Sequence, residues 1–277
     1  MKKIATTTFL MLATIFMSAG SLFAQFSPVN TANTEFRYQL PPATSNTTIL
    51  WEQEVNGNSG IVSDRFMGMP NTPIVLAADD FVLTERSEIQ TVFIPGFINA
   101  QDFAARGAGF ELFIFADNNS APSGTPIQPS AILWYGNFGM NSNGLTINDE
   151  GIVVEFTVDI FAAGGEKLIL EPGRYWVGGS AKVNSPNIEG NTRWNWYQGE
   201  NKETQAHLID PNNLFGGGFT NWTSFGTLGL TFTNLAFRIE GISGVEDVVP
   251  GPFGLLTPAD NTVLTLEADN STIVNIS

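Results

Sequence analysis

A five-residue run, Arg193-Trp194-Asn195-Trp196-Tyr197, gathers the side chains with the clearest binding chemistry in the sequence. Alternate residues of an extended strand share a face, so the two tryptophans would lie about 7 Å apart on one side of a sheet. Exposed indole rings are platforms for the apolar faces of sugars, and arginine and asparagine side chains hydrogen-bond to the hydroxyls around them. The run is therefore a candidate carbohydrate-binding strip, unless the tryptophans line the core. In that case Arg193, Asn195 and Tyr197 become the surface to test.

Acidic side chains are the candidates for catalysis, because glycoside hydrolysis needs two carboxyl groups about 5–10 Å apart and no fixed sequence motif. The candidates include Asp79, Asp80, Glu111, Glu155 and Asp159. Glu111 and Glu155 occupy outward positions of alternating strands, and Asp79-Asp80 opens a strand where it can accept turn hydrogen bonds. A secreted, glycosidase-like hydrolase is therefore the alternative to a non-catalytic protein.

Two turns rich in Asp and Asn supply the hard oxygen ligands that Ca²⁺ prefers. The candidate ligands are Asp117 and Asn119 in the first turn and Asp149 and Glu150 in the second. Neither turn matches a complete EF-hand loop, and ordinary Asx turns are the alternative. A structural calcium ion is the one cofactor that the sequence suggests.

The single histidine, His207, argues against nucleophilic catalysis and against a zinc site. It stands in a polar stretch without a Gly-x-Ser-x-Gly elbow, and the chain has no cysteine. One histidine without cysteine does not make a zinc site of the usual kind. We expect His207 to be a solvated loop residue.

The hydrophobic pattern of the chain predicts an all-β fold. Apolar runs of strand length, some alternating and some continuous, are separated by connections rich in Asn and Gly. The pattern predicts an antiparallel, jelly-roll-like β-sandwich of about ten to eleven strands over residues 48–242, without a convincing amphipathic helix. Residues 243–252 carry Pro and Gly and predict a linker. Residues 253–277 are too few to bury a core alone, so they either pair with the first domain or begin an incomplete second β-domain, and we favour the second.

The first residues have the pattern of an export signal. Residues 1–24 combine Lys2 and Lys3 with an apolar run and end on a small residue, Ala24, which predicts a signal peptide cleaved there. The apolar run is shorter than the roughly 20 residues of a membrane span. Residues 25–47 are polar and predict a flexible leader. We therefore expect a secreted or cell-surface protein without a transmembrane span after signal removal.

The charge and composition of the chain limit the classes of molecule that we expect it to bind. The net charge of −15 would repel nucleic acid and anionic lipid headgroups, and would attract divalent cations. Charged residues make up 14% of the chain, well below the typical quarter, as in extracellular all-β proteins. These observations exclude nucleic acid as an expected partner. The partners that stay open are polysaccharide, which the aromatic strip suggests, and a cell-surface protein.

An ordered set of short motifs carries a family resemblance. The motifs are Ala78-Asp79-Asp80-Phe81, Phe113-Ile114-Phe115-Ala116-Asp117 before Pro122-Ser123-Gly124, Pro172-Gly173-Arg174-Tyr175-Trp176-Val177, Trp194-Asn195-Trp196, and Leu235-Ala236-Phe237-Arg238-Ile239. In that order, they resemble an accessory β-sandwich module of secreted and cell-surface, Bacteroidetes-like bacterial proteins, over approximately Trp51 to Gly241. The tail from Phe253 to Asp260 resembles the opening of the immunoglobulin-like domains of starch-utilisation outer-membrane proteins.

The resemblance implies a function as well as a fold. It implies a non-catalytic module for surface attachment, or for glycan or protein recognition, within a larger extracellular protein. It implies no defined catalytic residues. A purely structural spacer domain remains as a further alternative, beside the secreted hydrolase.

Overall fold

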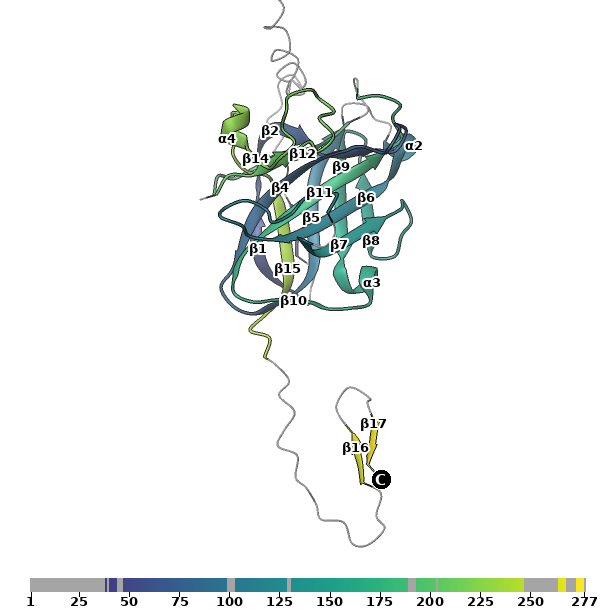
Figure 1. Ribbon diagram of the computed structural model, residues 1–277, viewed down its shortest axis with the longest axis vertical. Helices are drawn as coiled ribbons and strands as arrows, with labels where there is room; N and C mark the ends of the chain where they lie inside the picture. The colour runs from purple at the N-terminus through teal and green to yellow at the C-terminus, as the bar shows by residue number, and fades with distance from the viewer. Residues whose placement is uncertain are drawn as a thin grey trace, which may run out of the picture. The chain divides into compact units, whose positions relative to one another are not determined.

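A computed structural model describes residues 38, 40–43, 47–98, 103–128, 131–188, 193–202, 204–246, 264–267 and 273–276. The chain separates into two compact units, Met1–Gly244 and Val245–Ser277, and the first unit contains two large β-sheets (Figure 1). The boundary between the units falls inside the stretch predicted as a linker. The predicted signal peptide and most of the predicted leader lie outside the described residues.

One sheet has eight strands and is built around β5 (Ser87–Ile98). Its other strands are β1 (Thr48–Gln53), β2 (Val55–Val62), β8 (Leu145–Asp149), β9 (Val153–Asp159), β10 (Leu168–Leu170), β12 (Trp194–Gly199) and β15 (Phe237–Ser243). Along one side, β5 pairs with β15 and β12, and along the other with β10 and β9. The strands β1, β2 and β8 then pair with β15, β12 and β9. All of these pairs are antiparallel.

The second sheet has seven strands and is built around β11 (Gly173–Val183). Its other strands are β3 (Asp64–Phe66), β4 (Ile74–Leu83), β6 (Gly107–Ala116), β7 (Ile132–Phe138), β13 (His207–Ile209) and β14 (Thr223–Ser224). β11 pairs with β4 and β3 on one side and with β6 on the other, and β7 follows β6. The β3–β11 pair is parallel, so this sheet is mixed.

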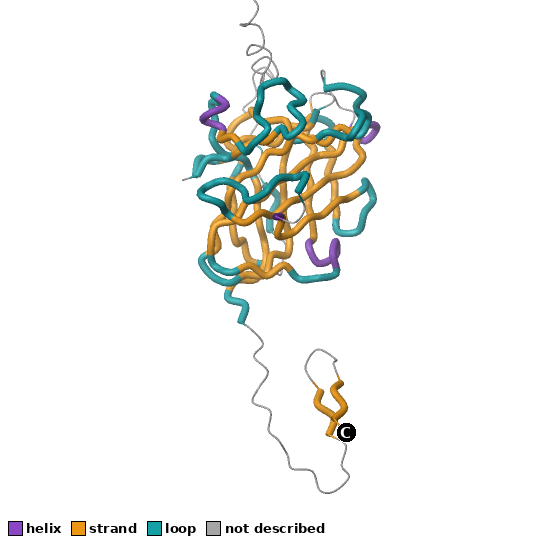
Figure 2. Tube along the Cα trace, viewed as in Figure 1, coloured by secondary structure: helices purple, strands orange, loops and turns teal. Residues whose placement is uncertain are grey.

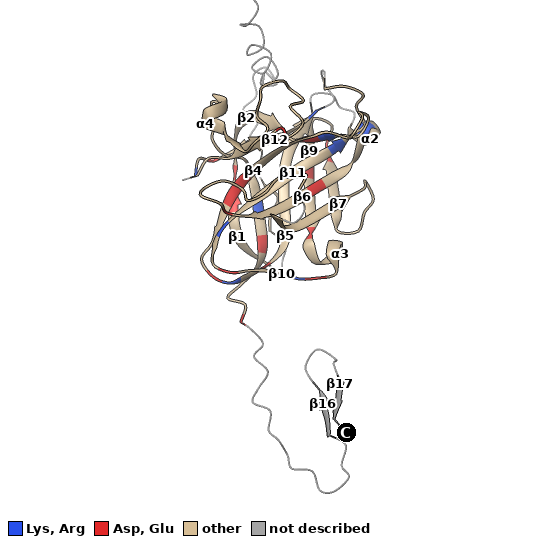
Figure 3. Cartoon of the chain, viewed as in Figure 1, with Lys and Arg blue, Asp and Glu red and all other residues tan. Residues whose placement is uncertain are grey.

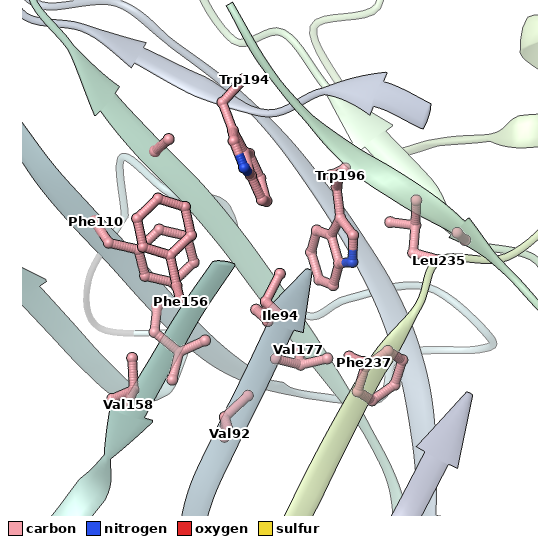
Figure 4. Packing of buried hydrophobic residues seen from close by; sticks show 14 of the residues in the cluster. Val92, Ile94, Phe110, Phe156, Val158, Val177, Trp194, Trp196, Leu235 and Phe237 are labelled. Atoms are coloured by element: carbon pink, nitrogen blue, oxygen red, sulfur yellow. The ribbon is translucent and has the colours of Figure 1, made fainter. Parts of the chain in front are cut away.

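Alternate residues of both sheets point into a shared hydrophobic core. On β6, Phe110 and Ile114 face inward, and on β9 Phe156 does the same. The rings of Phe110 and Phe156 stack with centroids 4.1 Å apart, and both rings are 0% exposed (Figure 4). Burying such a side chain stabilises the fold by about 1.5–3 kcal/mol, so this core is the main source of stability in a protein without disulfides.

The outward face of the seven-stranded sheet carries a second apolar cluster. Its buried members are Ile74, Leu76, Ala78, Phe113, Phe115, Trp176 and Ile209. Trp222 packs against this cluster and its Nε1 donates a hydrogen bond to the carbonyl of Gly124 at 2.6 Å. Connections between strands therefore cover part of the outward face, which explains why several strands are apolar on both sides.

The predicted all-β sandwich is confirmed, but the number of strands is larger than predicted. The two sheets contain fifteen strands among the described residues, against the ten to eleven expected. Strands β3, β10 and β13 have three residues each and β14 has two. Strands this short show no hydrophobic alternation by which the sequence could predict them. The helices described are single turns, α2 (Phe103–Arg106), α3 (Ile160–Gly164) and α4 (Phe225–Leu228) (Figure 2).

In the second unit, β16 (Leu264–Glu267) and β17 (Ile273–Ile276) form an antiparallel pair. An antiparallel pair is compatible with the start of a β-domain, and the immunoglobulin-like identity of this unit stays a prediction. Within the described part of the chain, no helix has both the length and the hydropathy of a membrane span.

Candidate functional site

Trp194 and Trp196 lie inside the sandwich. Both side chains are 0% exposed and point from β12 into the core (Figure 4). The indole Nε1 of Trp194 donates to the carbonyl of Val154 at 2.9 Å, and that of Trp196 donates to the carbonyl of Ala236 at 2.6 Å. A Cβ atom at Gly96 would lie 2.3 Å from the Trp194 ring, so the glycine leaves room for the indole. The two tryptophans form a wall of the core and present no platform to a ligand.

The other residues of the predicted strip are also covered. Arg193, Asn195 and Tyr197 are only 5–8% exposed. The Tyr197 ring lies between Phe97, with centroids 4.7 Å apart, and Tyr38, with centroids 6.0 Å apart. Neighbouring rings therefore cover Tyr197, and the Arg193 guanidinium lies 5.7 Å from the centroid of the Phe215 ring.

The first predicted cation turn is an Asx turn linked to the sheet beside it. Asp117 follows β6, and its Oδ1 accepts a hydrogen bond from the Nε1 of Trp176 at 2.8 Å. Its Oδ2 accepts from the backbone N–H of Ser120 at 3.3 Å. Asn119 has a φ of 55°, in the left-handed region that asparagine tolerates. Turn geometry accounts for the composition of this segment.

The second predicted cation turn belongs to the other sheet. Asp149 ends β8, and its Oδ1 accepts from the backbone N–H of Gly151 at 2.9 Å. The Oε1 of Glu150 accepts from the Nδ2 of Asn148 at 3.3 Å. The two turns do not share a sheet, and the described residues contain no group of three acidic or histidine side chains placed to hold a metal.

Two of the candidate acids share a face without forming a pair. Asp80 and Glu111 both point outward from the seven-stranded sheet. In the strand register, Asp80 lies opposite Trp176 and Glu111 opposite Ser180, which are four residues apart on β11. At about 3.3 Å per residue this separates them by roughly 13 Å along the strand, beyond the spacing of glycosidase pairs.

Glu155 and Asp159 belong to β9 in the eight-stranded sheet. Glu155 lies on the outward face, as its alternation with core residues predicts, and accepts hydrogen bonds from the hydroxyl of Tyr38 and from the Nδ2 of Asn148. Asp159 caps α3 by accepting from the backbone N–H of Ala162 at 2.8 Å. Both carboxylates therefore have local structural partners.

Asp79 points into the sandwich from the middle of β4, and the prediction that it opens a strand was wrong. The apolar run of this strand begins five residues earlier, at Ile74. The carboxylate accepts hydrogen bonds from four N–H donors: Gln53 Nε2 (2.8 Å), Leu235 N (2.7 Å), Asp80 N (2.9 Å) and Asn234 Nδ2 (3.2 Å). Burial raises the pKa of Asp79 to about 8, although these donors oppose the rise. Asp79 thus links β1 and β4 to the segment that leads into β15.

Buried carboxyl groups make the stability of the fold depend on pH. Burial raises the pKa of Asp79 to about 8, that of Asp80 to about 6, and those of Asp64 and Asp210 above their ordinary values. Between about pH 4 and pH 8 the folded protein therefore keeps protons that the same carboxyl groups release in the unfolded chain. The contribution of these groups to the free energy of unfolding is complete below about pH 4 and is lost as the pH rises toward 8. We expect a melting temperature about 4–8 °C higher at pH 5 than at pH 8, equivalent to about 2 kcal/mol.

Thermal unfolding followed by circular dichroism from pH 4 to pH 9 measures this dependence. Asp80→Asn is the matched variant, and its melting temperature should vary less between pH 4 and pH 6 than that of the wild type. Burial lowers the pKa of His207, which opposes the trend at the acidic end. A melting temperature that is equal or higher at pH 8 would contradict the prediction.

His207 lies in a strand, which corrects the prediction of a solvated loop residue. It opens β13, a three-residue strand preceded by polar residues, and is half-buried. Its ring packs edge-on against Trp176 with centroids 5.0 Å apart, and its Nδ1 lies 2.9 Å from the carbonyl of Gln205. Packing on an indole explains both the burial and the lowered pKa.

A pocket of approximately 320 Å³ opens on the outward face of the seven-stranded sheet. It is lined by Arg65, Met67, Thr72, Glu111, Tyr135, Asn137 and Lys182. The strand register brings these residues together, because Lys182 on β11 pairs with Arg65 on β3, and Glu111 on β6 pairs with Asn137 on β7. Four adjacent strands therefore each contribute an outward side chain to one site.

The charged groups of the pocket are held in place by direct contacts. Glu111 is 1% exposed, and its two carboxylate oxygens accept from the Nε of Arg65 at 2.5 Å and from the hydroxyl of Tyr135 at 2.6 Å. Lys182 is 8% exposed, and its Nζ donates to the Oδ1 of Asn137 at 2.8 Å. Burial lowers the pKa of Lys182, while burial and Glu111 raise that of the Tyr135 phenol.

The pocket combines an exposed ring with fixed polar groups. Tyr135 is 42% exposed and its ring rests on Phe113, with centroids 4.9 Å apart. Charged positions are sparse on the strands of the sandwich, most of which is apolar or neutral (Figure 3). A site that gathers Arg65, Glu111 and Lys182 is therefore unusual for this chain, and its chemistry suits hydrogen-bonded recognition of a polar ligand.

The sequence interpretation did not single out this pocket. Its members come from positions far apart in the chain, from Arg65 to Lys182. The signal available was that Arg65, Glu111 and Tyr135 occupy polar or aromatic positions within apolar strands. Lys182 lies beyond the motif Pro172–Val177, because β11 continues to Val183.

Comparisons of this chain with protein-family models, with curated proteins and with solved structures find no match.

Proposed function

We propose that the chain is a secreted, non-catalytic β-sandwich module for surface attachment or recognition within a larger extracellular protein, and that it recognises glycans through this pocket. The observation that carries the proposal is the half-exposed Tyr135 ring, which lies beside hydrogen-bonding groups already fixed in position. Such a ring packs against the apolar face of a sugar, while neighbouring amide and charged groups bind its hydroxyls.

The dimensions and the polarity of the pocket support a small, polar ligand. A volume of approximately 320 Å³ is at the lower end of the roughly 300–1,000 Å³ typical of ligand sites. Five of the seven lining residues are polar or charged, and the two others are Met67 and Tyr135. The site thus suits a single sugar unit, either terminal or within a chain, better than an apolar molecule.

The pocket also favours recognition over hydrolysis. Of the residues that line it, Glu111 alone is a carboxylate, and Arg65 and Tyr135 engage both of its oxygens. A glycosidase needs a second carboxyl group within about 10 Å that can exchange a proton or attack the sugar. A secreted hydrolase and a structural spacer are the outcomes that a binding experiment must separate from glycan recognition.

We expect Tyr135→Ser to weaken glycan binding about tenfold or more, because it removes the stacking surface. Leu133→Ser is the matched control: Leu133 is on the same strand, is 46% exposed, and does not line the pocket. Affinity electrophoresis of the full chain through gels that contain soluble polysaccharides measures the binding, and circular dichroism checks that both variants fold.

Retardation of the wild type and of Leu133→Ser, but not of Tyr135→Ser, is the expected result. Equal retardation of all three would place glycan binding elsewhere on the protein. Release of shorter sugars from the polysaccharide would favour the hydrolase. Retention on no polysaccharide would favour the spacer.

A further inference from the structure

We propose that the pocket selects a carboxylate-bearing sugar, such as a uronic acid unit, and binds its carboxylate between Lys182 and Arg65. This inference rests on the proposed glycan recognition and names the ligand class of that same site.

The first support is that Lys182 has no ion pair of its own among the described residues, because the nearby Glu111, whose charge favours the Lys182 ammonium, is paired with Arg65. Lys182 is 8% exposed, and its Nζ donates to the neutral amide of Asn137. Within the described part of the chain, no ion pair involves Lys182, whereas Glu111 is paired with Arg65. Two cations and one carboxylate leave the pocket with a net charge of about +1 at neutral pH. A buried charge whose nearest carboxylate is shared with a second cation is costly, so a bound anion would relieve that cost.

The second support is the direction of the remaining donors. Lys182 and Arg65 are paired across β11 and β3, which places their side chains next to each other on the outward face. The Nε of Arg65 is taken by Glu111, and its Nη1 donates to the carbonyl of Thr72 at 3.0 Å. The Nη2 of Arg65 has no hydrogen bond among the described residues, and Lys182 has further ammonium protons. These donors are available to one carboxylate.

The pocket is less suited to a phosphate than to a carboxylate. Phosphate sites typically use the whole guanidinium fork or several backbone N–H groups. Here part of the fork is occupied by Glu111, whose own charge repels a dianion. A ligand with a single negative charge matches the single net positive charge of the site.

The rest of the lining favours a sugar acid over an acidic peptide. The Tyr135 ring is supported from below by Phe113 and offers a flat surface next to the two cations. A pyranose ring that stacks there can direct a carboxylate attached to it toward Lys182. Its hydroxyls then lie near Asn137, whose amide both donates and accepts hydrogen bonds.

The test compares polygalacturonate with its fully methyl-esterified form, which has the same sugar backbone without the negative charge. Wild-type full chain should bind the acid form at least about tenfold more tightly than the ester in affinity electrophoresis at low salt. Lys182→Met, which keeps the length of the apolar stem, should bind both forms equally, and Lys182→Arg should retain the preference. Adding 0.5 M NaCl should reduce the preference of the wild type.

A second readout separates ligand recognition from a structural role of Lys182. Because Lys182→Met removes a buried, unpaired charge, its melting temperature should equal or exceed that of the wild type while the acid preference disappears. A marked loss of stability in this variant, with the preference for the acid form intact, would overturn the inference.

The possible failures are distinguishable. If both forms bind the wild type equally and Tyr135→Ser weakens both, glycan recognition stands and the selection of an acidic sugar is wrong. If neither form binds and an acidic peptide binds instead, both the proposed function and the inference fall. If acetate alone competes as well as the oligosaccharide, the site binds a simple anion and the sugar class is wrong.

Discussion

Replacing Asp79 with asparagine is expected to lower the free energy of unfolding by about 3 kcal/mol or more. Each carboxylate oxygen accepts from one backbone N–H, Leu235 at Oδ2 and Asp80 at Oδ1. The amide NH₂ of an asparagine would face one of these N–H groups in either orientation, and a backbone N–H cannot become an acceptor. The substitution therefore places two donors against each other at a position that is 0% exposed.

The side-chain partners cannot adjust to the change. Asn234 Nδ2 also donates to the carbonyl of Thr204 at 2.6 Å, while its Oδ1 accepts from the backbone of Lys202. Gln53 Nε2 also donates to the carbonyl of Leu235 at 2.7 Å, so turning either amide would break a second hydrogen bond. Because a domain is stable by only about 5–15 kcal/mol, the loss is a large part of the total.

Urea unfolding at pH 9, where Asp79 with its pKa of about 8 is ionised, measures this effect, with Asp149→Asn as the control. Asp149 is exposed, and asparagine can accept the same turn hydrogen bond, so the control should change stability by less than about 0.5 kcal/mol. A midpoint for Asp79→Asn within error of the wild type would show that the four-donor network is not essential to the fold.

The strand pattern predicted the sandwich but left open the direction of its central aromatic strand. Trp194 and Trp196 had to share a face, and the structure confirms that they do. Their inward direction did not follow from the sequence, because Tyr197 gives the other face of the strand an aromatic side chain as well. Only the position of β12 beside β5, over Gly96, decides which face meets the core.

The pocket depends on pairing register, which single-sequence patterns do not specify. Alternation predicts that Glu111 points outward, but not that Asn137 lies opposite it or that Lys182 lies opposite Arg65. The β3–β11 pair is parallel and only three residues long, so no local sequence pattern predicts that these two strands pair. The two predicted cation-binding turns do not come together in one site, because their residues belong to different sheets.

Buried polar groups were the least predictable feature. Asp79 stands between Ala77 and Phe81, both of which face the core, and the alternation of β4 places the carboxylate inside with them. The general rule that acidic residues lie at the protein surface would therefore place Asp79 wrongly. Its four donors come from positions as distant as Gln53 and Leu235, so the network that stabilises it exists only in the folded chain.

Each of the single variants Trp194→Ala and Trp196→Ala is expected to destabilise the protein by about 3–5 kcal/mol. Both indoles are fully buried, and each also satisfies a backbone carbonyl through Nε1, so truncation creates a large cavity and leaves a buried acceptor unpaired. Phe161→Ala is the control, because Phe161 is 56% exposed and its removal should cost less than about 1 kcal/mol.

The conservative variants Trp194→Phe and Trp196→Phe separate packing from ligand binding. They should remain folded with a smaller loss of stability, and they should retain the polysaccharide affinity of the wild type, because the proposed binding surface is at Tyr135 on the opposite sheet. Trp194 packs against Phe110 and Phe156, with centroids 6.1 and 5.3 Å apart, so a smaller ring can still fill part of the space. A folded Trp194→Ala protein with unchanged stability and lost affinity would instead restore the tryptophan strip as the binding site.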